Sequence, residues 1–302
     1  MYRGDFIGFL YLVEEKEKNH NKNFFLKLFQ KLRPKIKDGI YNNEGNKIGI
    51  ISKINLKSIE DVQKLIYKIN KIKEENTKYL IIENLNLFSR EKLNLIENET
   101  NLKILNGMKI ISYFFPLVLK ELYIILNEDL KRKEVLIFCG SKELTEEFIL
   151  NLSKEVKFIT LVGDNKEIIE DISKNILEST GLSIFHSRNI EKILKNYPII
   201  INLNDNTEIN ENKIRKEAII FDFSLGKTFK SLKNCEIVED FIFKIDGLNI
   251  KENSHMEYGL PSSLYEYFNK VEIEDLKGLL IKGQVYNPEN FINGKIRQIR
   301  RL

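Results

Sequence analysis

Hydrophobic and polar positions alternate along this chain in blocks that predict strand, helix, strand, helix, repeated. In the second half, short and nearly unbroken apolar runs are typical of strands that are covered on both faces. These runs are Val135–Phe138, Phe158–Val162, Leu182–Phe185, Ile199–Leu203, Ala218–Phe223 and Phe241–Ile245. Apolar residues between the runs recur at helical spacing, and Gly181 follows one such stretch at a typical helix end. This alternation predicts an α/β fold in which a doubly wound parallel sheet occupies the second half.

The first half shows the same rhythm with weaker signals. Apolar runs at Phe6–Val13, Lys47–Ser52 and Tyr79–Ile82 predict strands, and a helical pattern that begins at Ser58 predicts a helix before the last of them.

An apolar helix and a polar stretch after it suggest where two lobes meet. Residues Ile110–Asn127 are apolar nearly all round, which predicts a buried helix with Pro116 in its first turn. We therefore expect an N-terminal α/β lobe with a crossing helix over residues 1–128, and a second lobe over residues 129–302. The basic end of the second lobe, Gly294–Leu302, is expected to be a frayed, solubilising tail.

Composition excludes several classes of function. The net charge of +4 over 302 residues is mild, whereas nucleic-acid binders usually concentrate more basic charge, so we expect no nucleic-acid partner. Cys139 and Cys235 lie far apart without a partner motif and the three histidines are isolated, so we expect no disulfide framework and no metal site. The apolar stretch around Pro116 is too short for a membrane span. We expect a cytoplasmic protein that binds a small molecule. A homodimer is possible, and the sequence leaves the oligomeric state open.

The turn after the first strand of the second lobe is the place where such a sheet binds phosphate, because helix N–H groups converge there. The turn contains Gly140, Ser141 and Lys142, followed by Glu143. Gly140 would shape the turn, and Ser141 and Lys142 would contact phosphate. The dinucleotide fingerprint has three glycines where this turn has one, and Glu143 adds negative charge. A plain tight turn that needs one glycine is the alternative.

Asp164 follows the second strand of this lobe, about 20 residues beyond the turn. An acidic residue at that point accepts hydrogen bonds from the adenosine ribose in dinucleotide-binding folds, and it favours NAD over NADP. The alternative is that Asp164 or Asn165 caps the helix that begins at Lys166.

Two later strands end in polar residues, at the sheet edge where open α/β sheets bind ligands. Asn202, Asn204, Asp222 and Ser224 are therefore candidates to line a cleft, and we count Asn202 and Ser224 among the cofactor-binding residues. Ordinary loop and cap chemistry is the alternative for each of them.

The run from Val135 to Ser224 resembles the nucleotide-binding domain of bilobal dehydrogenases, the group that includes shikimate dehydrogenase and methylene-tetrahydrofolate dehydrogenase. The resemblance lies in the segments VLIFCGSKELTEEF, FITLVGDN, IIINLND and AIIFDFS. It implies a Rossmann-like lobe, a crossing helix at Ile110–Asn127 and a returning helix that begins within Ser262–Asn269. The first lobe contains no match to the catalytic Lys/Asp or Tyr/Lys pairs of these enzymes, so the catalytic residues are unknown.

Three functions follow from this sequence. The first is an NAD(P)-binding, oxidoreductase-like protein that acts on a small polar metabolite in an interlobe cleft, with NAD favoured. The second is a catalytically inactive Rossmann-like sensor or protein-interaction module, which the single glycine favours. The third is binding of another nucleotide-containing ligand without hydride transfer.

Overall fold

A computed structural model describes residues 8–14, 35–56, 61–188, 190–246, 248 and 259–300. The chain forms two compact units. Unit 1 comprises Met1–Asn106 and Ile245–Lys270, and unit 2 comprises Gly107–Lys244 and Val271–Leu302. The expected boundary lay between residues 128 and 129, but the helix after Asn106 packs with the helices of unit 2, and residues 245–270 fall in unit 1 instead of the second lobe.

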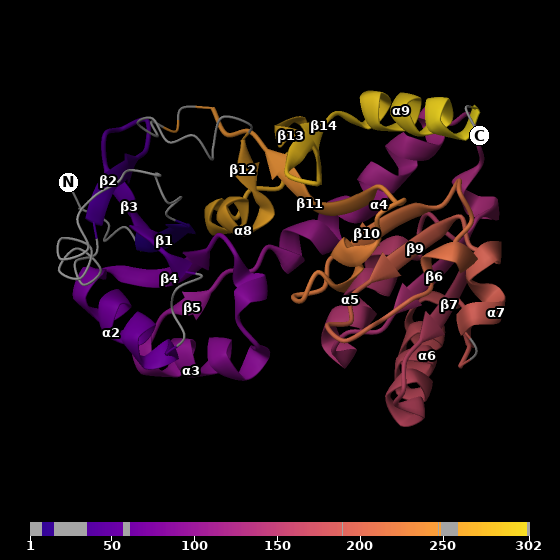
Figure 1. Ribbon diagram of the computed structural model, residues 1–302, viewed down its shortest axis with the longest axis horizontal. Coiled ribbons are helices and arrows are strands. Elements are labelled where there is room, and N and C mark those ends of the chain that lie inside the picture. Colours follow the sequence, from indigo (N-terminus) through magenta and orange to yellow (C-terminus); the bar gives the residue numbers. More distant parts are fainter. Residues whose placement is uncertain are drawn as a thin grey trace. The chain divides into compact units, whose positions relative to one another are not determined.

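Unit 1 is built on a five-stranded sheet of order β2-β3-β1-β4-β5 (Figure 1). Strand β2 is antiparallel to β3, and the other neighbours are parallel. The strands are β1 (Gly8–Glu14), β2 (Lys35–Tyr41), β3 (Lys47–Ile54), β4 (Thr77–Ile82) and β5 (Lys103–Ile104). The unit also contains α2 (Val62–Ile72), α3 (Arg90–Thr100), β12 (Leu260–Pro261) and α8 (Ser262–Tyr265).

Helix α2 shows how the apolar pattern builds unit 1. Its buried residues all belong to one core cluster with the sheet; they are Val62, Leu65, Ile66, Ile69 and Ile72. The expected start at Ser58 lies outside the described residues, and Asp61 caps the helix by accepting from the N–H of Gln63. The segment expected to begin a returning helix forms only the short α8 followed by a 3-10 turn.

Unit 2 has a larger sheet of order β14-β13-β11-β10-β9-β6-β7-β8. Its strands are β6 (Glu134–Phe138), β7 (Phe158–Val162), β8 (Ile184–His186), β9 (Ile199–Asn202), β10 (Ile219–Asp222), β11 (Ile237–Phe243), β13 (Leu276–Ile281) and β14 (Gln284–Tyr286). Strands β6 to β11 are parallel, and their order corresponds to 3-2-1-4-5-6 in the sequence of strands. This is the strand order of the Rossmann fold, so the expected doubly wound sheet is confirmed. Strands β13 and β14 extend it as antiparallel strands that the sequence pattern did not predict.

The helices of unit 2 include α4 (Met108–Ile125), α5 (Lys142–Leu152), α6 (Lys166–Thr180), α7 (Ile190–Ile193) and α9 (Pro288–Arg300) (Figure 1). Aromatic side chains join α4 and α5 to the sheet, since the Phe115 ring contacts those of Phe148 and Phe221. Gly181 ends α6 with a φ of 74°, as predicted. Among the described residues, no helix is both long and apolar enough to span a membrane.

Two details of the α4 and α9 region correct the sequence analysis. Helix α4 begins at Met108, so Pro116 lies inside it rather than in its first turn. Burial of a long apolar surface outweighs the one backbone hydrogen bond that Pro116 cannot donate. The basic segment expected to fray is helical as far as Arg300, as part of α9, which packs on α4, and its Lys295 side chain is buried.

Candidate functional site

The candidate site is the carboxyl edge of the unit 2 sheet, where β6 and β9 lie side by side. Strands β7 and β8 are placed on one side of β6, and β9 and β10 are placed on the other. This reversal is the topological switch point at which open α/β sheets bind ligands. The turn into α5, the end of β7 and the loops after β9 and β10 all lie at this edge (Figure 1).

The turn between β6 and α5 is closed by its own hydrogen bonds. Ser141 is the N-cap of α5, and its Oγ accepts from the N–H of Leu144 at 3.4 Å. The buried Thr145 hydroxyl accepts from the N–H of Gly140 at 3.1 Å and donates to the carbonyl of Ser141 at 2.8 Å. The Gly140 N–H is therefore occupied inside the protein.

Gly140 is required by a close approach from the neighbouring strand. A Cβ added at Gly140 would lie 2.6 Å from the carbonyl oxygen of Leu203, the residue after β9. The N–H of Leu203 donates to the carbonyl of Phe138, and Asn204 Nδ2 donates to the carbonyl of Cys139 at 2.9 Å. The loop after β9 is thus fastened to the turn, and this packing alone accounts for the glycine.

Lys142 does not extend over the turn. Its Nζ lies 3.0 Å from Asp171 Oδ2 on α6, and this hydrogen bond raises the pKa of Lys142. The donors that remain toward a phosphate are the backbone N–H groups of the first turn of α5, which have no partner within the helix.

Asp164 is an exposed carboxylate at the end of β7, beside the turn. The N–H of Cys139 donates to the carbonyl of Val162 at 2.8 Å, which holds the two segments together. The alternatives for the start of α6 are resolved, because Asn165 is its N-cap and accepts from the N–H of Ile168. Within the described part of the chain, the Asp164 carboxylate has no hydrogen bond or ion pair.

Asn202 and Ser224 lie in a buried polar network around Asp222 rather than on an open surface. Asp222 Oδ1 accepts from Asn202 Nδ2 at 3.0 Å and from Ser224 Oγ at 2.6 Å. Its other oxygen accepts from the N–H of Phe229 at 2.8 Å, and Asn202 Nδ2 also donates to Thr228 Oγ1 at 2.8 Å. Asn202, Asp222 and Ser224 are each at most 1% exposed, so their polar atoms are used inside the fold.

Lys227 is a further residue at this edge that sequence reasoning did not identify. It has a φ of 47°, and its Nζ donates to the carbonyls of Asp222 and Glu239, each at 2.8 Å. Burial lowers the pKa of Lys227, and the nearby Asp222 carboxylate opposes this shift. The lysine ties the loop after β10 to β11. A left-handed lysine after Gly226 gives no recognisable signal in the sequence.

Cys139 lies in the turn between β6 and α5, but its thiol is a poor nucleophile. The side chain is 7% exposed, and burial raises the pKa of Cys139 to about 12. Among the described residues, no group of three or more acidic, histidine or cysteine side chains could hold a metal ion.

In unit 1, two acidic residues lie at the carboxyl ends of neighbouring parallel strands. Glu14 ends β1 and Glu83 follows β4, two parallel neighbours, and the N–H of Glu14 donates to Glu83 Oε2 at 2.7 Å. Glu14 Oε2 also accepts from the N–H of Leu56 at 3.1 Å. An acidic residue directly after an apolar run was the available signal for both.

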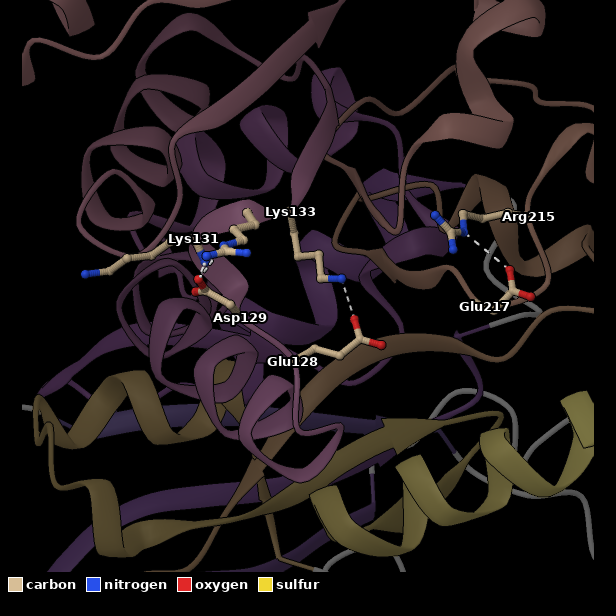
Figure 2. Close-up of polar contacts among 7 residues, drawn as sticks. Glu128, Asp129, Lys131, Lys133, Arg215 and Glu217 are labelled. Atoms are coloured by element: carbon tan, nitrogen blue, oxygen red, sulfur yellow. Dashed lines mark hydrogen bonds and ion pairs between the residues drawn. The ribbon is translucent and has the colours of Figure 1, made fainter.

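The opposite edge of the unit 2 sheet carries a group of ion pairs, shown in Figure 2. Lys133, just before β6, pairs with Glu128, and Arg215 Nε lies 3.3 Å from Glu217 Oε2 shortly before β10. These side chains lie at the amino ends of the strands, and the pairs are partly exposed to solvent. They therefore belong to the protein surface at the amino ends of the strands and not to the candidate site at the carboxyl edge.

Comparison with known proteins gives fold-level likenesses at low identity. No protein-family model matches the chain, and no curated protein matches it. A dipicolinate synthase chain from Bacillus halodurans is 12% identical, with 54% of each chain covered and a TM-score of 0.31. Shikimate 5-dehydrogenase from Listeria monocytogenes, solved with shikimate and NAD, is 10% identical, with 76% of this chain and 86% of that chain covered and a TM-score of 0.32. Ornithine carbamoyltransferase from Campylobacter jejuni is 14% identical, with 72% and 74% covered and a TM-score of 0.35.

The match spans about half of the length of the dipicolinate synthase chain. Scores of this size carry no argument on their own, and the Rossmann-type fold of unit 2 is assigned from its strand order.

Proposed function

We propose that unit 2 binds a nicotinamide dinucleotide, with NAD preferred over NADP, in a protein of oxidoreductase type that acts on a small polar metabolite. The pyrophosphate lies over the first turn of α5, and the adenosine ribose lies at Asp164. The substrate class and its expected place between the two lobes stay predictions.

The observation that carries this proposal is the position and state of Asp164. The residue follows the second strand of a sheet with Rossmann order and is exposed. The neighbouring Asn165 performs the capping role, so the helix does not require the Asp164 carboxylate. A carboxylate at this position accepts hydrogen bonds from both ribose hydroxyls of NAD and repels the 2′-phosphate of NADP.

The phosphate contacts in this proposal come from the main chain. Ser141 shapes the start of α5, and the N–H groups of Lys142 and Glu143 are the donors. Lys142 contributes its side chain only if its ion pair with Asp171 opens. Asn202 and Ser224 stabilise the loops at this edge and do not contact the cofactor, because their polar atoms are already hydrogen-bonded to Asp222.

The test is thermal unfolding of the purified protein with NAD, NADH, NADP and NADPH. A ligand that binds only the native state adds about 2.7 kcal/mol of stability at 100 times its dissociation constant. We expect NAD or NADH to raise the midpoint more than the phosphorylated forms do. In Asp164→Asn this preference is expected to disappear.

Glu167→Gln is the matched control, because it removes an exposed carboxylate from the first turn of the same helix. It should leave the nucleotide shifts unchanged. If none of the four nucleotides raises the midpoint, or if both variants respond alike, the proposed site is wrong.

A second function is favoured by the closed turn: a Rossmann unit without a cofactor that acts as a sensor or protein-interaction module. Thr145 occupies the N–H of Gly140, and Leu203 fills the space above the glycine. The same thermal unfolding experiment separates the two functions, because this alternative predicts that no nucleotide shifts the midpoint.

A further inference from the structure

Helix α5 carries one basic side chain among acidic ones. Lys142 is its first residue, and its other charged residues are Glu143, Glu146 and Glu147. A pyrophosphate placed over the first turn of α5 therefore meets several carboxylates and one ammonium group. Because like charges repel, the position of the Lys142 ammonium group strongly affects how well this turn accepts an anion.

That ammonium group is held by a carboxylate of the neighbouring helix. Lys142 Nζ donates a hydrogen bond to Asp171 Oδ2 on α6 at 3.0 Å. The side chains of Lys142 and Asp171 are 33% and 66% exposed, so the ion pair lies at the protein surface. An ion pair as exposed as this one contributes little to stability and is easily broken by a competing anion.

Opening this ion pair does not separate the two helices. About one turn further along each helix, Asn175 Nδ2 on α6 donates to Glu146 Oε1 on α5 at 2.7 Å. This contact does not involve Lys142 or Asp171, and α5 also packs against α6. The Lys142 side chain is therefore able to change its partner while α5 and α6 keep their positions.

The position of Lys142 at the start of α5 determines where its side chain extends. In an α-helix the Cα–Cβ bonds tilt toward the N-terminus, so a long side chain in the first turn reaches toward the helix start. The free backbone N–H groups of that turn point the same way. Once it leaves Asp171, the ammonium group of Lys142 is therefore within reach of an anion that these N–H groups bind.

We infer that Asp171 is a positioning residue for the proposed nucleotide site, and that Lys142 exchanges the Asp171 carboxylate for the pyrophosphate when a dinucleotide binds. This inference rests on the proposed function, because it requires a pyrophosphate over the first turn of α5. The phosphate and Asp171 compete for one ammonium group, so Asp171 lowers the affinity for the nucleotide. The phosphate displaces the exposed carboxylate because the helix N–H groups bind it as well.

Isothermal titration calorimetry with NADH measures this competition in four full-length chains: the natural chain, Asp171→Asn, Lys142→Met and the double variant. Asp171→Asn keeps the size of the side chain and removes its charge. We expect it to bind NADH about two- to fivefold more tightly, which is the range that an exposed ion pair contributes. Lys142→Met should bind NADH more weakly than the natural chain. In the double variant the gain from Asp171→Asn should be largely lost, because the lysine that it releases is absent.

Two controls separate this competition from other effects. Glu167→Gln removes an exposed carboxylate from the same helix without releasing Lys142, and it should leave the affinity for NADH unchanged. Thermal unfolding without nucleotide should give nearly the same midpoint for Asp171→Asn as for the natural chain, because the ion pair is exposed. A contact that only supported the structure would weaken NADH binding when it was broken, so tighter binding identifies competition.

The inference is overturned if Asp171→Asn binds NADH as the natural chain does, or more weakly. It is also overturned if Asp171→Asn tightens binding equally in the presence and absence of Lys142, since this would show repulsion by the Asp171 charge alone. Both results leave the dinucleotide site intact, provided that the natural chain binds NADH and that Asp164→Asn loses the preference for NADH over NADPH. If the natural chain binds no nucleotide, the proposed site and this inference are both wrong.

Discussion

Gly140→Ala tests whether the one glycine of the phosphate-side turn serves the protein or a ligand. The added Cβ would lie 2.6 Å from the carbonyl oxygen of Leu203 and 3.2 Å from its Cβ. The first contact is with a main-chain atom, so the steric clash can be relieved only if the loop after β9 moves. Such a movement also lengthens the hydrogen bond that Asn204 Nδ2 donates to the carbonyl of Cys139.

The magnitude follows from two opposing effects. Overpacking of a close contact costs about 1–3 kcal/mol, whereas a glycine-to-alanine change at an ordinary φ restricts the unfolded chain and returns about 0.4–1 kcal/mol. We expect a net loss of about 1–2 kcal/mol in the free energy of unfolding, which lowers the midpoint of the unit 2 transition by about 2–8 °C. Differential scanning calorimetry without nucleotide measures this loss.

Gly294→Ala is the matched control. It makes the same chemical change inside α9, where an added Cβ meets nothing within 4 Å, so it should raise stability by about 0.5–1 kcal/mol. The reasoning is refuted if Gly140→Ala is as stable as the natural chain and loses only nucleotide affinity. That result would mean that the glycine makes room for phosphate and not for Leu203.

Three further predictions concern buried groups. Burial lowers the pKa of Lys227 below 10.5. Between the lowered pKa and 10.5 the native state therefore binds fewer protons than the unfolded chain. The contribution of Lys227 to the free energy of unfolding then rises with pH in this range. Urea unfolding at stepwise higher pH should therefore favour the natural chain increasingly over Lys227→Met, and a constant difference would contradict this. The Cys139 thiol, with its pKa raised to about 12, should resist iodoacetamide near pH 8 until urea is added, as peptide mass spectrometry can show; rapid labelling of the native chain would disprove it. Ser52 is fully buried in β3 with no described hydrogen-bond partner for its hydroxyl, so Ser52→Ala should be neutral or stabilise by up to about 1 kcal/mol in urea unfolding, and a clear loss would show a missed partner.

The regular part of the fold could be predicted because burial on both faces demands unbroken apolar runs. β7 matches its predicted bounds, and α6 ends at Gly181 as expected. β11 begins at Ile237, earlier than the expected Phe241, because Glu239 and Asp240 interrupt its apolar run. The spacing of apolar residues alone does not reveal the full length of a strand whose apolar run is interrupted by charged residues, even when both neighbours of the strand are in the sheet.

The site was harder to predict because its side chains choose partners that are distant in sequence. Lys142 pairs with Asp171 on the next helix, and a sequence pattern contains no information on that choice. Asn202 and Asp222 follow apolar runs, as a ligand-binding residue would, but they bond to each other across neighbouring strands. Asp164 is exposed, and the adjacent Asn165 takes the capping role, so the ribose-binding role of Asp164 stays a prediction.

Hydrogen–deuterium exchange with and without NADH tests most directly whether unit 2 is a dinucleotide-binding fold. We expect slower exchange at the first turn of α5, around Ser141 to Leu144, and at the end of β7 near Asp164, with the second effect lost in Asp164→Asn. Unchanged exchange at both segments under saturating NADH, or protection confined to another part of the chain, would contradict the account and favour a Rossmann unit without a cofactor.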